Sequence, residues 1–171
     1  LAEQGVPNYF GRQRFGARGD SWKVGEAMVR GDLEAALNQV LGCPGPLDRG
    51  DILRARELYE ERQYQQAFRK WPGMYRDERR ALKAMERTKG NHRRAFLSID
   101  RGLRRFYVSA FQSHLFNQIV ADRLRSGTLG TLENGDLAEV HRNGAVFEVL
   151  DCTIEKPRAA AFEISPSGPL Y

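Results

Sequence analysis

The feature that most constrains this chain is a long run of helical periodicity between Leu103 and Arg125. Two adjacent rows of apolar residues recur at steps of three to four: Val108, Phe111, Leu115 and Ile119 in one row, and Phe116, Val120 and Leu124 in the other. Because an α-helix turns once in about 3.6 residues, such rows lie along neighbouring faces of one helix. The width of this apolar surface predicts a helix that is buried over much of its circumference.

Shorter helices are predicted upstream of this long one, separated by strong turn signals. They cover approximately residues 20–30, 33–41, 51–63, 76–88 and 93–97, and residues 65–71 form a short segment that ends at Pro72-Gly73. The residues predicted to cap helix starts are Asp20, Asp32, Asp48 and Asp51. Residues 1–19 contain glycines, a proline and arginines among aromatic residues, and this composition predicts an ordered loop or short strand rather than a helix.

The pattern of residues changes after Gly127, where short apolar runs alternate with turn signals. The pair Asn143-Gly144 predicts a two-residue hairpin turn between strands at 137–141 and 145–150. The chain is therefore predicted to have an α+β fold. We place a domain boundary after residue 126, with residues 1–126 mostly helical and residues 127–171 rich in strands.

Composition limits the classes of function. A formal net charge of +5 favours a polyanionic partner, although a soluble domain that happens to be basic is an equal alternative. Two distant cysteines, Cys43 and Cys152, do not indicate a disulfide scaffold, so a reducing cytoplasmic compartment is expected. Neither a signal peptide nor an apolar run of membrane-spanning length is evident. Since the sequence opens at Leu1 and stops after a Pro/Gly-rich turn, we expect a partial chain.

The most informative stretch for function is residues 5–16, where cationic and aromatic side chains alternate. Arg12 and Arg14, with Arg18 just beyond, are suited to phosphate oxygens, and the rings of residues 9, 10 and 15 are suited to stacking on an unpaired base. Asn8 offers both a donor and an acceptor. The alternative is a structural loop whose rings pack inward. The three histidines show no metal-ligand spacing, so no metal site is predicted.

Two long motifs resemble signatures of the TruD family of transfer-RNA pseudouridine synthases. Residues 8–16 read Asn-Tyr-Phe-Gly-x-Gln-Arg-Phe-Gly, and residues 106–117 read Phe-Tyr-Val-Ser-Ala-Phe-Gln-Ser-x-Leu-Phe-Asn. Gly135-Asp136 and Ser165-Pro166-Ser167-Gly168-Pro169 are similar to pieces of that family's insertion domain. These blocks follow the family's order and span almost the whole chain.

The resemblance implies a mixed α/β catalytic domain, here a mostly helical part at 1–126, followed by a truncated start of the TRUD insertion domain at 127–171. It implies isomerisation of uridine, classically at position thirteen of tRNA, without cofactor or metal. An aspartate acts on the target nucleotide, the glycosidic bond breaks, and the uracil rejoins through C5 after leaving the stack. By position, Phe10 would stack on the flipped base and Asn8 would hydrogen-bond near it. Arg12 and Arg14 are assigned to RNA on charge grounds alone, and either could instead be a structural ion-pair partner.

The family's nucleophilic aspartate belongs to a Lys-Asp motif that nothing in this sequence matches. We therefore expect it upstream and expect these residues alone to be inactive. The alternatives from other classes are a non-catalytic RNA-binding module or RNA chaperone, and a helical DNA-binding protein. A basic stretch from Arg76 to Arg94 could either follow phosphates or form a solvated, partly paired helix face. The sequence leaves the oligomeric state open, with a monomer as the default.

Overall fold

The computed structural model describes residues 7–167, which form two compact units. One unit, here the helical unit, consists of Gly11–His114. The other, here the mixed unit, contains the residues up to Phe10 together with Leu115–Tyr171. The long helix α7, Arg101–Ser126, contributes its first part to the helical unit and its second part to the mixed unit. The motif residues Gly168 and Pro169, and Gly5 of the first segment, lie outside the described residues.

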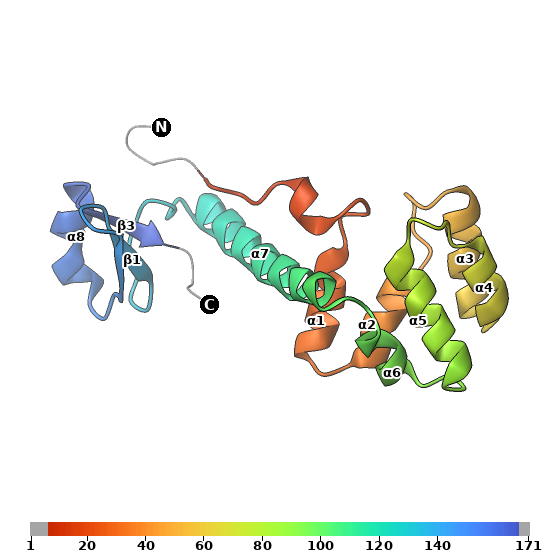
Figure 1. Ribbon diagram of the computed structural model, residues 1–171. Helices are drawn as coiled ribbons and strands as arrows, with labels where there is room; N and C mark the ends of the chain where they lie inside the picture. The colour runs from red at the N-terminus through yellow and green to blue at the C-terminus, as the bar shows by residue number, and fades with distance from the viewer. Residues whose placement is uncertain (1–6, 168–171) are drawn as a thin grey trace. The chain divides into compact units, whose positions relative to one another are not determined.

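The helical unit packs short helices around one apolar core (Figure 1). Its elements are the 3-10 turn η1 (Arg12–Phe15), α1 (Ser21–Val29), α2 (Leu33–Leu41), α3 (Gly50–Glu60), α4 (Tyr64–Lys70), α5 (Arg76–Arg87), α6 (His92–Leu97) and the start of α7. Helix α2 packs on α1 and α6, while α4 packs on α3 and α5. Trp71, Phe96, Leu37, Leu82 and Met85 are among the fully buried side chains. The helices predicted from periodicity are all present.

Helix starts follow the capping rules at some positions and depart from them at others. Asp32 caps α2, since its Oδ1 accepts a hydrogen bond from the N–H of Ala35 over 2.9 Å. Asp100 caps α7 in the same way, through the N–H groups of Gly102 and Leu103. Asp20 stands at the N-cap of α1, but its side chain makes no capping bond and pairs with an arginine instead.

The predicted caps of α3 are wrong, because Asp48 and Asp51 serve other partners. The N-cap residue is Arg49, and Asp51 lies in the first turn with its carboxylate 3.0 Å from Nζ of Lys70. Asp48 is buried and lies 3.2 Å from Nε of Arg56, which is also buried. A buried carboxylate needs such a partner to offset its desolvation. Capping rules read only the local sequence and could not foresee an arginine from the next turns of the helix.

The mixed unit contains an antiparallel sheet of three short strands in the order β2-β1-β3. Its elements are β1 (Leu137–Val140), β2 (Ala145–Glu148), α8 (Cys152–Ala160) and β3 (Ile164–Ser167). The predicted hairpin pairs as expected, but four residues, 141–144, connect its strands instead of two. Gly144 has a positive φ of 68° and donates to the carbonyl of Val140 over 2.8 Å, which closes this longer turn.

Helix α8 was not predicted, because the apolar residue Ile154 was assigned to a strand-rich region. Asp151 accepts a hydrogen bond from the N–H of Thr153 over 2.9 Å and caps this helix. Ile154 itself is exposed. With sheet and helices together, the predicted α+β class is confirmed.

Helix α7 occupies residues 101–126, close to the predicted range, but the residues that are buried differ from the predicted apolar rows. The buried residues are Tyr107, Ala110, Ser113 and Val120, whereas Leu115, Ile119 and Leu124 from the predicted apolar rows are exposed. Two of these buried residues, Ala110 and Ser113, are small and allow neighbouring segments to approach the helix axis closely. None of the helices between residues 7 and 167 has the length and apolar character that crossing a bilayer requires.

Candidate functional site

In the mixed unit, the backbone of Phe10 is held by one side chain of α7. The N–H of Phe10 donates to Oδ1 of Asn117 over 2.9 Å, and Nδ2 of Asn117 donates to the carbonyl of Phe10 over 3.0 Å. An amide carries both a donor and an acceptor, so a single asparagine satisfies both backbone groups. The ring of Phe10 meets Phe116 edge-on, with centroids 5.5 Å apart at 75°. These contacts set the direction of the Phe10 side chain.

The aromatic side chains next to this clamp remain accessible. Phe10 and Tyr9 each keep 43% of their surface exposed, and Asn8 is exposed as well. The alternative in which these rings pack inward as core residues does not fit this exposure. An accessible ring on a clamped backbone can offer a face to an unpaired base without reorganising.

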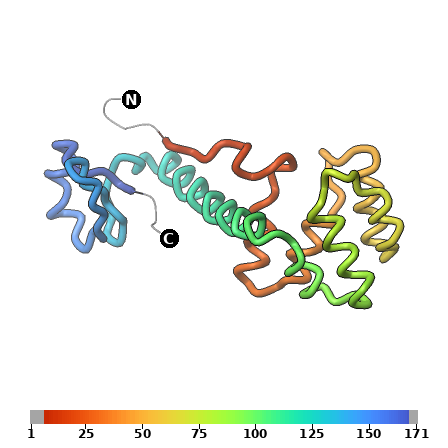
Figure 2. Tube along the Cα trace, viewed as in Figure 1, coloured from red at the N-terminus to blue at the C-terminus, as the bar shows by residue number. Residues whose placement is uncertain are grey.

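In the helical unit, Arg14 is bound to α7 by hydroxyl groups. Its Nε donates to Oγ of Ser113 over 3.0 Å, and its Nη2 donates to Oγ of Ser109. The chain from Gly11 to Gly16 accordingly lies beside this part of α7 (Figures 1 and 2). Arg12 is exposed, and its side chain makes no hydrogen bond or ion pair with any residue in the range 7–167. Residues 12–15 form a 3-10 turn, where the sequence predicted no helix.

Ser109, Ser113 and Asn117 are the site residues that the sequence reasoning missed. They are spaced by four residues, so they lie along one stripe of α7. Two of them contact Arg14 and the third contacts Phe10. The apolar rows dominated the interpretation of this helix, although the polar stripe carried an equally regular signal. The two sequence motifs are therefore joined residue by residue through hydrogen bonds.

Arg18, which the sequence grouped with Arg12 and Arg14, is half-buried and belongs to an ion-pair network that includes the buried Asp48 and Arg56. Its Nη2 lies 2.9 Å from the carboxylate of Asp20 and donates to the carbonyl of Cys43 over 2.8 Å. Its Nε is 3.8 Å from Asp48, the partner of Arg56. These contacts hold the end of the N-terminal segment against the helical unit.

A second aromatic group follows the 3-10 turn. The imidazole of His114 stacks on the indole of Trp22, with centroids 3.8 Å apart at 5°, and Phe15 meets His114 edge-on at 6.4 Å. Burial lowers the pKa of His114, while the charge of Glu26 opposes this shift. A neutral, stacked imidazole fits a role in packing α1 against α7 better than one in proton transfer.

Gly25 allows α1 to cross α7 at very short range. A Cβ at this position would lie 2.1 Å from the carbonyl oxygen of Tyr107 and 2.8 Å from Cβ of Phe111. Since real Cβ atoms do not approach a carbonyl oxygen so closely, only glycine fits. Next to this crossing, Trp22 stacks on His114.

The basic stretch from Arg76 to Arg94 divides between internal and solvent-exposed contacts. Arg79 donates to the carbonyls of Phe68 and Trp71 and lies over the ring of Phe68 at 4.0 Å. Arg80 pairs with Asp77 at 3.3 Å. Part of the stretch is therefore structural. Among the residues that the structure describes, no group of three or more His, Cys, Asp or Glu side chains is placed to hold a metal ion.

A family model described as tRNA pseudouridine synthase D (TruD) matches residues 1–171. The chain belongs to the TruD family. A curated tRNA pseudouridine synthase D from Geobacter metallireducens is 42% identical over the whole chain, which covers 42% of that protein. One from Geotalea daltonii is 39% identical over the whole chain, which covers 43% of it. The chain thus spans less than half the length of these relatives.

The TruD fold is also found in a solved structure from Methanosarcina mazei that carries the TruD name. That structure matches 95% of this chain and 40% of its own length, with a TM-score of 0.82 at 24% sequence identity. The resemblance inferred from residues 8–16 and 106–117 is thereby confirmed at the level of both family and fold. The assignments of Asn8, Phe10, Arg12 and Arg14 to the substrate remain predictions.

Proposed function

We propose that the TruD-family protein carrying this chain isomerises a uridine of tRNA to pseudouridine. The observation that carries this proposal is the accessible ring of Phe10 on a backbone clamped by Asn117, because it joins the two family motifs in one contact. In the reaction the bond between C1′ and N1 breaks, a bond between C1′ and C5 forms, and a proton moves from C5 to N1. No net oxidation occurs, so the reaction requires no redox cofactor.

The proposed role of Phe10 is to hold the uracil after it leaves the stack. Extrusion of a base costs a few kcal/mol, and stacking on an aromatic ring returns about 1–3 kcal/mol. Asn8 lies two residues before Phe10, is exposed, and provides a donor and an acceptor for the base edge. The clamp at Asn117 reduces the entropy that the segment would otherwise lose on binding.

Arg12 is the stronger candidate of the two arginines for contact with RNA phosphates. It is exposed and makes no side-chain hydrogen bond or ion pair within residues 7–167, whereas Arg14 is half-buried and hydrogen-bonded to Ser109 and Ser113. A net charge of +5 supports a polyanionic partner in general.

We infer that these 171 residues are inactive by themselves, because each aspartate has a structural contact. Asp32, Asp100 and Asp151 cap helices. The others form ion pairs: Asp20 with Arg18, Asp48 with Arg56, Asp51 with Lys70, Asp77 with Arg80, Asp122 with Arg125, and Asp136 with Arg123. None stands as a poised nucleophile. The catalytic aspartate is thus expected in the remainder of the protein.

The finer assignments follow the family resemblance. We propose uridine thirteen of tRNA as the target and the cytoplasm as the compartment. Residues 1–126 are assigned to the catalytic domain and residues 127–171 to the start of the insertion domain, with a monomer as the default state.

The test uses the full-length protein and an unmodified tRNA transcript, with pseudouridine mapped by carbodiimide labelling and primer extension. We expect Phe10→Leu to lower kcat/KM by about 10- to 100-fold, because the substitution removes the stacking ring. Since Phe10 is 43% exposed, the melting temperature should change little. Phe162→Leu is the matched control, because Phe162 is 61% exposed and lies outside the motif.

Unchanged kcat/KM in Phe10→Leu would remove the proposed stacking role. A full-length protein that binds tRNA but forms no pseudouridine would instead support the non-catalytic alternative. The isolated 171-residue chain, assayed in parallel, is expected to form none.

A further inference from the structure

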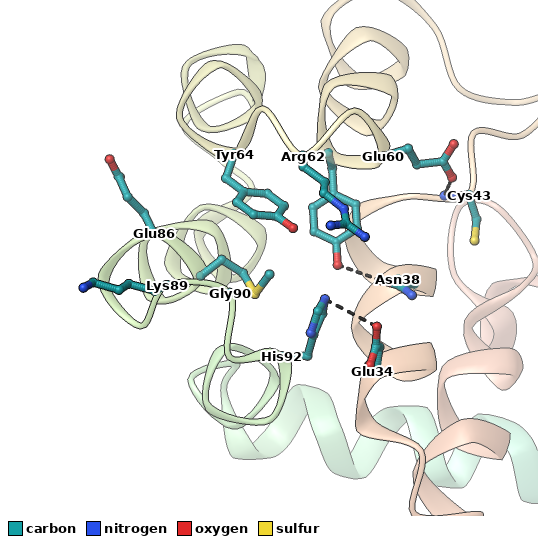
Figure 3. A pocket seen from close by; sticks show the side chains of 12 residues that line it. Glu34, Asn38, Cys43, Glu60, Arg62, Tyr64, Glu86, Lys89, Gly90 and His92 are labelled. Carbon is teal, nitrogen blue, oxygen red and sulfur yellow. Dashed lines mark hydrogen bonds and ion pairs between the residues drawn. The ribbon is translucent and has the colours of Figure 1, made fainter.

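The helical unit contains a cavity of about 670 Å³ that the proposed reaction at Phe10 does not use. Side chains from α2, from the ends of α3 and α5, and from the starts of α4 and α6 line it (Figure 3). Among them are Asn38, Tyr59, Arg62, Tyr64, Met85 and His92. The volume lies in the range of pockets that hold small organic ligands.

An unusual backbone feature marks this cavity. Cys43, Arg62 and Lys89 line it, and all three have positive φ values, of 49°, 61° and 52°. In the part of the chain that the structure describes, one further non-glycine residue, Phe162, has a positive φ. Glycine adopts this region without steric conflict, so side chains retained there are strained, and such strain gathers at functional sites.

Arg62 places a positive charge at the wall of the cavity. It follows the end of α3, where its N–H donates to the carbonyl of Tyr59 over 2.9 Å and glycine is the usual residue. Within residues 7–167 its guanidinium has no hydrogen bond or ion pair. Figure 3 shows the Arg62 guanidinium and the Tyr64 ring both directed toward the middle of the cavity. An unpartnered guanidinium next to an aromatic ring is suited to a ligand that is both anionic and planar.

The opposite wall supplies fixed polar groups. The hydroxyl of Tyr59 donates to Oδ1 of Asn38 over 2.7 Å, and Nε2 of His92 lies 3.7 Å from Oε1 of Glu34. Met85 also lines the cavity. Amide, imidazole and carboxylate groups are the ones that read the hydrogen-bonding edge of a nucleobase.

We propose that this cavity binds one unpaired nucleotide of the RNA, other than the target uridine, with its base against Tyr64 and its phosphate on Arg62. The proposal rests on the proposed function, which makes RNA the partner. RNA loops offer such nucleotides, because their bases can be splayed out and stacked on aromatic rings. The cavity thereby adds a second point of recognition that would select an RNA by its loop structure.

The first test titrates 5′-AMP and 5′-UMP into the ¹⁵N-labelled chain and follows amide chemical shifts. We expect shifts at the cavity residues, and the affinity for the better nucleotide should fall about 5- to 100-fold in Tyr64→Leu, which keeps apolar bulk but removes the ring. Arg62→Gly should lower the affinity for that nucleotide about tenfold and leave the affinity for the unphosphorylated nucleoside unchanged.

Arg62→Gly separates binding from folding. Because glycine adopts the positive φ without strain, this variant should melt at or close to the temperature of the unchanged chain. Arg69→Ala is the charge-matched control, since Arg69 is exposed on α4 and does not line the cavity. The proposal is overturned if Arg62→Gly leaves nucleotide binding unaffected. It is also overturned if the cavity residues show no chemical-shift changes at about 10 mM nucleotide, since a dissociation constant above about 10 mM is too weak for a ligand of nucleotide size.

A second measurement separates this inference from the proposed function. In the full-length protein, Tyr64→Leu and Arg62→Gly should raise KM for tRNA more than they lower kcat. If tRNA is modified normally by both variants, the cavity proposal fails and the proposed function stands. If nucleotides bind the cavity but Phe10→Leu leaves pseudouridine formation unchanged, the stacking role of Phe10 fails and the cavity proposal stands.

Discussion

At the scale of single residues, Asn117 binds both backbone polar groups of Phe10. We predict that Asn117→Asp, which preserves shape, removes the donor to the Phe10 carbonyl and sets a carboxylate against it. The loss of this hydrogen bond should destabilise the native state by about 1 kcal/mol, because the bond is at an exposed position. The full-length protein should lose more activity than this stability change explains.

Thermal melting and kcat/KM for tRNA are the measurements for Asn117→Asp. Gln118→Glu is the matched control, because it makes the same change from amide to acid at the exposed neighbouring position. Equal effects of the two substitutions would mean that added charge, rather than the lost clamp, is responsible.

The half-buried stack of His114 on Trp22 predicts a pH dependence of stability. Burial lowers the pKa of His114 in the native state below its value in the unfolded chain. Below the unfolded pKa of about 6.5 the unfolded chain therefore binds more protons, so stability falls as the pH decreases through this range and is regained above it. His114→Phe retains a ring for Trp22 but cannot titrate. The melting temperature of the variant should fall less between pH 7 and pH 5 than that of the unchanged chain, as measured by calorimetry at a series of pH values.

The sequence could not show which arginines of the N-terminal segment are available to a ligand. The alternation of rings and arginines agrees with the exposure of Tyr9 and Phe10, while the substrate roles assigned from it stay predictions. It could not separate Arg12 from Arg14 and Arg18, because the difference lies in partners that are distant in the chain, such as Ser113 and Asp48. Charge is a property of the residue, whereas its availability depends on the tertiary structure.

At the scale of the helices, the crossing of α1 over α7 depends on Gly25. In an exposed helix, replacing glycine by alanine stabilises by about 1 kcal/mol. Here the added Cβ would lie 2.1 Å from the carbonyl oxygen of Tyr107, so the helices must separate. We predict that Gly25→Ala destabilises the helical unit by about 3 kcal/mol, as forced overpacking does.

Denaturant unfolding followed by circular dichroism measures the effect of Gly25→Ala. Gly73→Ala is the control, since a Cβ at Gly73 would meet nothing within 4 Å. A stabilised Gly25→Ala variant would show that helix propensity outweighs the close contact and that the crossing is not tight.

Helix periodicity, together with stop signals, predicted most helices of the helical unit, but it assigned no helix to residues 12–15, which form the 3-10 turn η1, and it left α4 as a short segment. It failed on which residues of α7 are buried, since Ala110 and Ser113 form the contact line and carry little hydrophobic signal. It also missed α8, where the cap at Asp151 was a better guide than the apolar Ile154. The pocket at Arg62 has no sequence signal at all, because a positive φ at a non-glycine residue is visible only in the structure.

At the scale of the whole molecule, the two units have cores of very different extent. The helical unit buries large side chains such as Trp71, Phe96 and Leu82 in one cluster. In the described part of the mixed unit, the core cluster consists of Leu132, Ala138, Val149 and Ile164. Because stability grows with the apolar surface removed from water, the sheet should open at a lower free energy than the helices do.

Unfolding of this chain is therefore expected to proceed in two steps rather than one. Hydrogen exchange in increasing urea should show the amides of β1 and β2 losing protection before those of α5. Val149→Ala should weaken only the first step and Leu82→Ala only the second, each by about 2–3 kcal/mol, since both side chains are fully buried in separate clusters. The pair of substitutions serves as mutual control. If either one shifted both steps equally, the units would share a single cooperative core, and the small sheet would owe its stability to the helices rather than to its own four buried residues.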